Sequence, residues 1–107
     1  MTDSLVRIGP TQPGTSNGVL YTVPDGSQFS ILSIHIVNTT ASSATFNLAF
    51  GTAATEANCW AFEAPLDAYA QFDWSGLLAM DSLDTLDALQ GTSSALTYTI
   101  SGVLTTP

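Results

Sequence analysis

The chain has 107 residues, of which 45% are hydrophobic and 9% are charged, so it is long enough for one globular domain and too short for two. Arg7 is its only Lys or Arg against nine acidic residues, which gives a formal net charge of -8. Because nucleic acids and anionic membranes are bound through Lys and Arg, this balance predicts that neither is a partner.

The scarce charge is replaced by Thr, Ser, Ala, Gly and Asn, side chains that lose little on leaving water. Such a surface is suited to burial against other protein. Cys59 is the single cysteine, so it forms no internal disulfide and a structural zinc site lacks ligands. The N-terminus has no signal-peptide pattern and no apolar stretch reaches membrane-spanning length, so we expect synthesis in a cytoplasm.

Residues 1–18 are predicted to form an extended N-terminal arm. Residues 5–8 have the composition of a short strand, whereas residues 9–18 contain two prolines and three glycines, which exclude a helix. An ordered arm must be tethered to its own subunit or to a neighbour. The candidate interface residues for this contact are Leu5, Val6, Arg7 and Ile8.

Residues 19–23 form the next predicted strand, and the Pro-Asp-Gly-Ser sequence at 24–27 closes it with a tight turn. Residues 38–43 are polar and are expected to form a loop after the strand at 29–37, which is described below. Residues 44–50 then alternate between apolar and polar side chains, which indicates a half-buried strand.

Residues 29–37 form the strongest predicted strand because they are rich in β-branched side chains. Alternation places Leu32, Ile34 and Ile36 on one face. The other face is apolar at its ends and polar between, so we expect a central strand that is covered on both sides. The residues of that second face are Phe29, Ile31, Ser33, His35 and Val37.

The middle of the chain is less regular. Residues 51–58 fit either a loop or a helical turn that is too short to be stable alone. Residues 59–63 are predicted as a strand with Trp60 and Phe62 facing inward, and a turn is expected at 65–68. The next strand covers 69–74 and is expected to end at Ser75-Gly76. Its inward side chains are Ala70, Phe72 and Trp74.

Residues 77–89 fit a short helix or a turn followed by a strand. We favour a turn at 81–84 and a strand at 85–89, because the rest of the chain is a series of short strands. Residues 95–104 form the final strand, in which Gly102 marks a bulge or a close backbone approach. The inward side chains of this strand are Leu96, Tyr98 and Ile100.

About seven or eight short antiparallel strands at this spacing predict an all-β fold, a single β-sandwich or jelly roll. The predicted organisation is an extended arm at 1–18 followed by a β-sandwich domain at 19–107.

Two segments resemble a pattern in small virion proteins of tailed phages. Residues 19–26, Val-Leu-Tyr-Thr-Val-Pro-Asp-Gly, and residues 31–38, Ile-Leu-Ser-Ile-His-Ile-Val-Asn, look like the strands that open such β-sandwiches. Residues 84–86 and 96–103 are similar to their last two strands. Where that pattern often has Gly before Asp-x-Leu, Ser82-Leu83 stands here.

The resemblance spans residues 19–104 and implies a capsid decoration, or cement, protein that stabilises the outer capsid surface. The implied partners are the major capsid protein or another virion protein, and copies of itself in a trimer. The implied location is the capsid surface of the virion, after synthesis in the host cytoplasm.

No residue pattern indicates an enzyme. His35 lies in mid-strand and is interpreted as a packed or hydrogen-bonded side chain, and no Gly-x-Ser-x-Gly sequence presents a nucleophile. The spacing of Asp81, Asp84 and Asp87 does not match a calcium-binding loop. We therefore predict no catalytic residue, cofactor or metal.

Two alternatives to a decoration protein remain. One is a structural component of a phage tail or collar. The other is an adhesion or carbohydrate-binding module, in which aromatic side chains would stack on sugar rings. The residues of that platform would be Trp60, Tyr69, Phe72 and Trp74.

Overall fold

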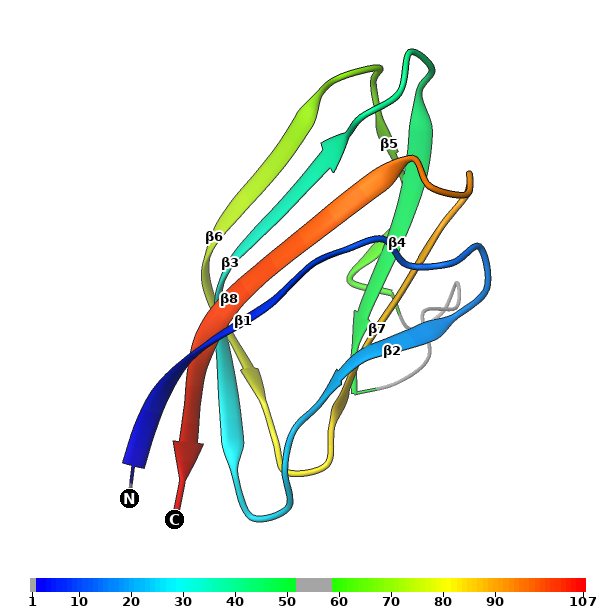
Figure 1. Ribbon diagram of the computed structural model, residues 1–107. Helices are drawn as coiled ribbons and strands as arrows, with labels where there is room; N and C mark the ends of the chain where they lie inside the picture. Colours follow the sequence, from blue (N-terminus) through cyan, green and yellow to red (C-terminus); the bar gives the residue numbers. More distant parts are fainter. Residues whose placement is uncertain (1, 52–58) are drawn as a thin grey trace.

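The computed structural model describes residues 2–51 and 59–107, which form eight β-strands and contain no helix (Figure 1). The all-β prediction is confirmed. The strands are β1 (Thr2–Thr11), β2 (Gly18–Thr22), β3 (Gln28–Asn38), β4 (Ala44–Phe50), β5 (Ala61–Leu66), β6 (Gln71–Met80), β7 (Thr85–Gln90) and β8 (Leu96–Thr106).

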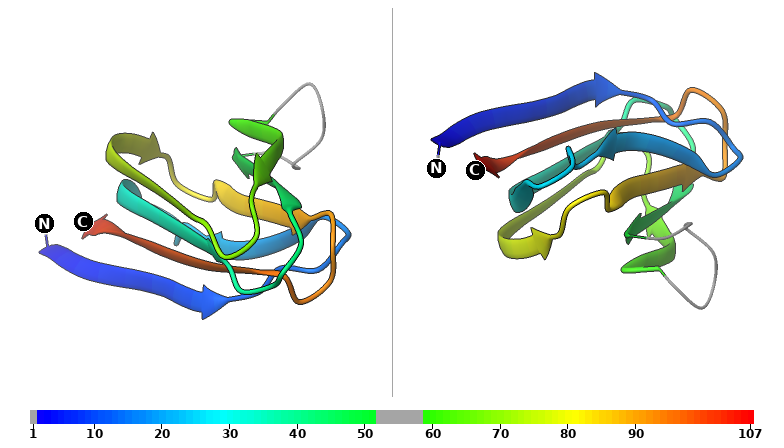
Figure 2. Two further views of the ribbon diagram at one scale, coloured as in Figure 1. Left: turned by 90° about the horizontal axis from the view of Figure 1, so that it is seen from above. Right: turned by 90° about the horizontal axis from the view of Figure 1, so that it is seen from below.

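The strands form two antiparallel sheets that face each other as a β-sandwich (Figure 2). Sheet A has the order β1-β8-β3-β6, and sheet B has the order β2-β7-β4-β5. Only β4 and β5 are neighbours both in sequence and in one sheet. Every other connection passes from one sheet to the other, so distant parts of the sequence lie side by side.

The N-terminal residues lie at the edge of sheet A. The strand predicted at 5–8 is part of β1, which pairs with β8 from Thr2 opposite Thr106 to Thr11 opposite Tyr98. The chain ends therefore lie beside each other at one end of the sandwich (Figure 1).

The core fills the space between the sheets. In β8, the predicted inward residues Leu96, Tyr98 and Ile100 are fully buried. Burial raises the pKa of the Tyr98 hydroxyl, which donates a hydrogen bond to the carbonyl oxygen of Leu89 over 3.2 Å. The strand at 85–89 and the turn at 81–84 are also confirmed, as β7 and the β6–β7 turn.

The predicted faces of β3 are wrong. Phe29 and Ile31 are fully buried with Ile34, whereas Leu32 is 40% exposed. The register of β3 shifts between Ile31 and Ser33 against both of its neighbours. The extra residue changes the phase of the alternation, so side chains on either side of it point to the same face. β3 is central in its sheet, but its outer face is covered by no further layer of the residues that the structure describes.

The predicted end of β6 is also wrong, because the same register shift lies within this strand. The strand does not stop at Ser75-Gly76 but continues to Met80, with a register shift at Gly76-Leu77. Its predicted inward residues before this point are confirmed as packing against the core. They are Ala70, Phe72 and Trp74.

The β4–β5 hairpin also departs from simple alternation. Phe62, predicted to face inward, is 44% exposed, because a bulge at Phe62-Glu63 interrupts the pairing with β4. The Glu63 N–H donates a hydrogen bond to the Asn47 side chain over 2.9 Å. Asn47 and Ala49 are buried, so β4 is more deeply covered than its half-buried pattern predicts. The turn expected at 65–68 instead follows Leu66.

Residues 52–58, where the sequence left a loop and a helical turn open, lie outside the described residues.

Two buried amides hold the loops at one end of the sandwich. The Asn38 side chain donates hydrogen bonds to the carbonyl oxygens of Ser42, Leu66 and Asp67, which joins the β3–β4 loop to the β5–β6 turn. Gln90 donates to the Pro13 carbonyl, and its side-chain oxygen accepts from the N–H groups of the first residue of β8 and of the residue before it. Polar groups that are fully buried in this way hold one loop arrangement.

We expect Gly102→Ala to destabilise the fold by about 2 kcal/mol, because a Cβ there would lie 2.2 Å from the Ser30 carbonyl oxygen, a backbone atom that cannot turn aside. Urea denaturation measures the free energy of unfolding. Gly14→Ala is the control, since its nearest neighbour would be 3.9 Å away. Equal stability of the two variants would contradict the close packing of β8 on β3.

We expect Gln90→Leu to cost about 3 kcal/mol, because the shape is kept while the N–H groups of Ala95 and Leu96 and the Pro13 carbonyl lose a buried partner. Thermal and urea unfolding measure the loss. The exposed Gln28→Leu change serves as the control and should stay within about 0.5 kcal/mol of the wild type. A Gln90→Leu variant as stable as this control would show that the amide does not hold the loops.

Candidate protein-binding surface

The outer face of sheet A is a broad surface that carries exposed apolar groups and little net charge. Residues directly opposite in an antiparallel pair point to the same side. This rule, together with the buried inner set, assigns the outer residues, all of which are exposed or half-buried. They are Asp3, Leu5 and Arg7 of β1; Thr97, Thr99, Ser101, Val103 and Thr105 of β8; Gln28, Ser30, Leu32, Ser33, His35 and Val37 of β3; and Gln71, Asp73, Ser75, Leu77 and Ala79 of β6.

Three leucines project from this face. Leu5 is 87% exposed, Leu77 is 68% exposed and Leu32 is 40% exposed. Leu32 and Leu77 lie at the register shifts of β3 and β6, so the bulges that bring Phe29 and Ile31 into the core also turn these leucines outward. Serine and threonine are the commonest side chains between them, and these small neutral groups are inexpensive to desolvate.

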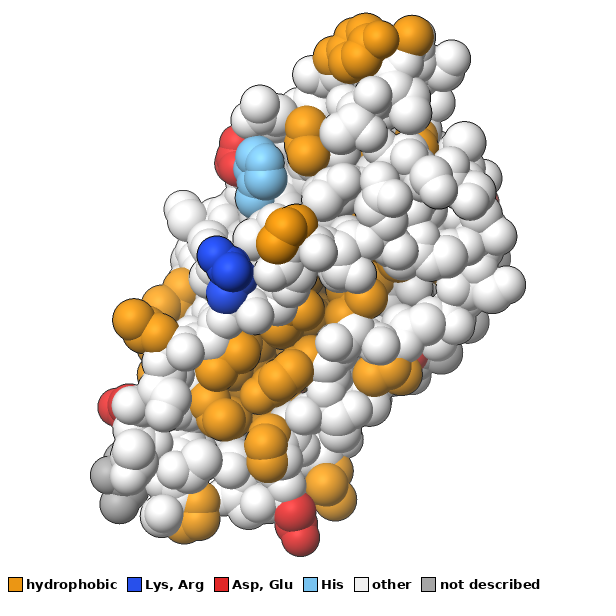
Figure 3. Space-filling model, in the orientation of Figure 1, with side chains coloured by type: hydrophobic (Ala, Val, Ile, Leu, Met, Phe, Trp, Pro, Cys, Tyr) orange, Lys and Arg blue, Asp and Glu red, His pale blue; other side chains and the backbone are white. Residues whose placement is uncertain are grey.

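The charges on this face differ from those of the rest of the chain. Arg7, the only Lys or Arg, and His35, the only histidine, both lie here, and Figure 3 shows these two kinds of side chain on the same side of the molecule. The His35 Nδ1 atom lies 2.5 Å from the Asp73 Oδ1 atom. With Asp3 and Asp73 against Arg7, the face carries about one of the eight net negative charges.

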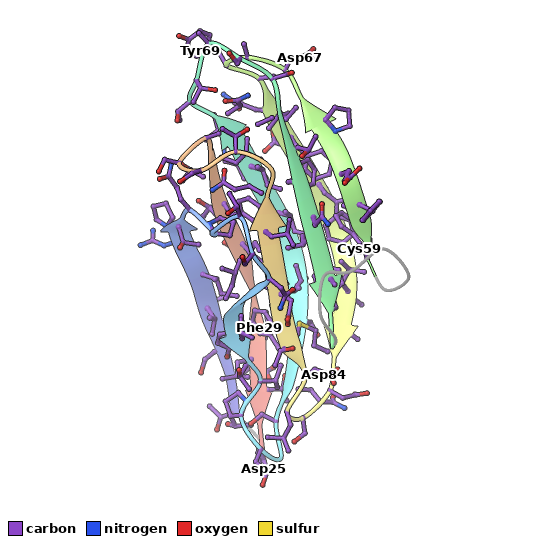
Figure 4. All side chains as sticks on the ribbon, turned by 90° about the vertical axis from the view of Figure 1, so that its right-hand side faces the viewer. Asp25, Phe29, Cys59, Asp67, Tyr69 and Asp84 are labelled. Carbon is purple, nitrogen blue, oxygen red and sulfur yellow. The ribbon has the colours of Figure 1, made fainter. Side chains whose placement is uncertain are left out.

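The other described acids lie elsewhere, in the turns and on sheet B. Asp25 and Asp84 lie toward one end of the sandwich and Asp67 lies at the other (Figure 4). We use the name acidic end for the turns at 23–27 and 81–84, which are joined by hydrogen bonds from Gly26 N to the Ser82 hydroxyl and from that hydroxyl to Asp25. Leu83 is 61% exposed there.

The alternation of β1 separates the four predicted interface residues. Leu5 and Arg7 are exposed on the outer face of sheet A, opposite Val103 and Ser101 of β8. Val6 and Ile8 point the other way. Val6 is half-buried, and Ile8 is 8% exposed and belongs to the core of its own chain.

A second apolar region lies where the sandwich opens between its edge strands β1 and β2 (Figure 3). Partly buried side chains of β1, β2 and β8 pack against the core. They include Val6, Leu20, Tyr21 and Leu104.

In the described part of the chain, the single cysteine and the single histidine belong to different sides of the sandwich. Among residues 2–51 and 59–107, no group of three His, Cys, Asp or Glu side chains could hold a metal ion. Cys59 is half-buried, and burial raises the pKa of its thiol against the opposing effect of a hydrogen bond with Leu48 of sheet B. It is therefore separate from His35 on the outer face of sheet A. A shallow pocket of about 250 Å³ between the β2–β3 turn and the C-terminus has no titratable side chain in its lining.

Two further observations concern sugars and membranes. Trp60 is 37% exposed, and its ring contacts the rings of Phe50, Phe72 and Trp74 at centroid distances of 5.6–6.3 Å, mostly at steep angles. These are the contacts of rings packed on one another. In the described part of the chain, no helix is long and apolar enough to cross a membrane.

Sequence reasoning found Leu5 and Arg7 but missed Leu32, Leu77 and Asp73 as parts of one surface. The available signal was Gly76, a glycine within an apolar run beside Leu77, which indicates a bulge inside a strand as well as a strand end.

No family model and no curated protein matches the sequence. Solved structures do match its fold. A chain in the acid-stable capsid structure of Helicobacter pylori bacteriophage KHP30 aligns with a TM-score of 0.60 and 12% identity, over 100% of this chain and 90% of that one. The fold is shared with viral capsid chains.

Two structures of infectious bursal disease virus also match. A chain of its T13 particle aligns with a TM-score of 0.56 and 9% identity, over 97% of this chain and 31% of that chain. The VP2 subviral particle gives 0.53 and 11%, over 97% and 32%. This protein therefore spans about a third of those viral chains, and at such identities the likeness establishes the fold alone.

We expect Leu5→Ala and Leu77→Ala to leave the free energy of unfolding within about 0.5 kcal/mol of the wild type, because neither side chain is buried within the monomer. Chemical denaturation at low protein concentration measures this. The matched change Leu48→Ala, at a fully buried leucine, should cost about 3 kcal/mol. A comparable loss at Leu5 or Leu77 would mean that these leucines serve the fold and not a partner.

Proposed function

We propose that this protein is a structural component of a viral particle, and more narrowly a capsid decoration protein of a tailed phage. In this role it binds the outer surface of the shell as an oligomer, contacts the major capsid protein and stabilises the particle. The observation that carries the proposal is the outer face of sheet A, a surface of low net charge with exposed leucines on a fold shared with capsid chains.

The topology supports this assignment. The strand orders 1-8-3-6 and 2-7-4-5, with the chain passing repeatedly between the sheets, fit a jelly roll, an architecture used by viral capsid domains and by lectins. The phage chain that matches this protein is nearly the same size, since each covers at least nine-tenths of the other. A capsid that contains a separate chain of this size favours an accessory component over a shell-forming one.

The charge distribution supports a contact with a basic shell. The acidic end holds Asp25, Asp81 and Asp84 beside the exposed Leu83, and an anionic surface is oriented by a cationic one. The trimer and the position on the capsid surface, after synthesis in the host cytoplasm, remain parts of this proposal. The absence of a catalytic role is also part of this proposal. It fits a surface whose only histidine, His35, is in contact with the Asp73 carboxylate.

The test uses particles of the virus that encodes this chain. Purified protein is mixed with shells that lack it and sedimented through a sucrose cushion. We expect saturable binding at a fixed number of copies per shell and shells that resist heating better than bare ones. Raising the salt from about 0.1 M to 1 M shortens the screening length from about 10 Å to 3 Å and should weaken the binding.

The double change Asp25→Lys and Asp84→Lys should reduce binding to shells, whereas Asp67→Lys, at the opposite end of the sandwich, should not. Protein that stays in the supernatant and is absent from purified virions by mass spectrometry would refute the proposal. Binding to tails in place of shells would support a tail or collar component, and binding on a glycan array would support the carbohydrate-binding alternative.

A further inference from the structure

The two edges of the outer face of sheet A carry complementary side chains. β1 forms one edge and presents Leu5 and Arg7, whereas β6 forms the opposite edge and presents Leu77 and Asp73. Apart from Asp3 near the start of β1, each edge therefore has one exposed leucine and one charge, and the charges of Arg7 and Asp73 have opposite signs.

The strand register gives the relative heights of these groups. Arg7 is opposite Ser101, which is opposite Ser33, which is opposite Ser75, so Arg7 and Ser75 share one row across the sheet. Asp73 lies two residues from Ser75, about 7 Å along the strand. That offset is within the length of an arginine side chain.

The strand register also gives the relative heights of the two leucines. Leu5 is opposite Val103, which pairs with Ser30, which pairs with Ala79. Leu77 lies two residues from Ala79, in the bulge of β6. Leu5 and Leu77 are therefore also close in height on opposite edges of the sheet.

We infer that the outer face of sheet A is the interface of a homodimer, in which two copies pack face to face about a two-fold axis that runs parallel to the strands. This axis places β1 of one copy over β6 of the other, and β8 over β3. Arg7 of each copy then meets Asp73 of its partner, and Leu5 packs beside the partner's Leu77.

A second copy is the partner that the charges favour. Two chains with a net charge of -8 repel each other through most of their surfaces, and this face carries only a small part of that charge. It also supplies both members of the ion pair. A carboxylate accepts several hydrogen bonds, so the contact of Asp73 with His35 leaves capacity for the partner's guanidinium.

The area of the face is sufficient for a weak dimer. Four strands about 4.8 Å apart and roughly 30 Å long cover about 600 Å² per copy. Both copies together would bury about 1,200 Å², the lower limit of stable specific interfaces. We therefore expect a dimer whose population depends on concentration in the micromolar range.

This inference does not depend on the proposed virion role, because the contact involves only this chain. It also differs from the proposed trimer, since a three-fold axis requires a different pair of surfaces. An icosahedral shell has both kinds of axis, so the two contacts are compatible on one particle.

Sedimentation equilibrium of the full chain across a range of concentrations tests the inference. We expect the wild type to be in monomer–dimer equilibrium. Asp73→Arg should raise the dissociation constant at least about tenfold, because the two-fold interface contains two of these ion pairs and one substitution removes both. Asp81→Arg changes the net charge equally, but lies at the acidic end, and should leave dimerisation intact or slightly stronger.

The charge swap Arg7→Asp with Asp73→Arg restores the net charge of -8 and should restore the dimer to within a few-fold of the wild type. This rescue separates the specific pair from a general effect of charge. A wild type that is monomeric at every concentration would overturn the inference, as would a swap that fails to rescue.

Disulfide trapping checks the geometry separately. In a Cys59→Ser background, the double variant Leu5→Cys and Leu77→Cys should form covalent dimers when treated with diamide. Each single variant should remain monomeric on a reducing-agent-free gel, since the axis brings residue 5 to residue 77 and not to its own copy. Cross-linking by a single variant would reject this homodimer. If the chain never dimerises and Asp73→Arg abolishes binding to shells, the homodimer is also rejected and the face is assigned to another partner.

Discussion

Where β3 passes Gly102, one extra residue, Leu32, enters the strand, and the side chains beyond it change phase. The core and the outer surface of sheet A both depend on this shift. Without it, Phe29 and Ile31 would point to solvent whenever Ile34 and Ile36 point inward. With it, all four fill the core, and the residues at the shift, Leu32 on β3 and Leu77 on β6, are directed outward. Gly102 permits the arrangement because any larger residue would collide with the Ser30 carbonyl.

This dependence explains how much of the fold could be predicted. Strand content, the β6–β7 turn and the inward set of β8 follow from local composition and strict alternation, which act within a few residues. The faces of β3 and the extent of β6 could not be predicted in the same way. A bulge is defined by the pairing of strands that are far apart in the sequence, and Ile31 lies 71 positions before its partner Gly102.

The candidate surface shows the same division. Leu5 and Arg7 could be identified from the sequence because an apolar and charged strand at the N-terminus needs a contact. Their relation to Asp73 and Leu77 requires the order β1-β8-β3-β6. Leu83 is an instructive intermediate case: it stands where the similar phage pattern often has glycine, and its φ of 68° is a conformation that glycine adopts at little cost. Leucine therefore holds this left-handed backbone conformation at a steric cost that glycine would avoid.

The pairing of Thr2 with Thr106 has a mechanical consequence. Because the two chain ends leave the sandwich side by side from adjacent antiparallel strands, a force that pulls them apart loads the β1–β8 ladder at its open end. The cross-strand hydrogen bonds then break one after another, starting with those nearest the termini. The force acts on one bond after another and is not distributed over the whole ladder. Tension between the termini would peel β1 from the edge first, while the six strands β2–β7 remain outside the line of force.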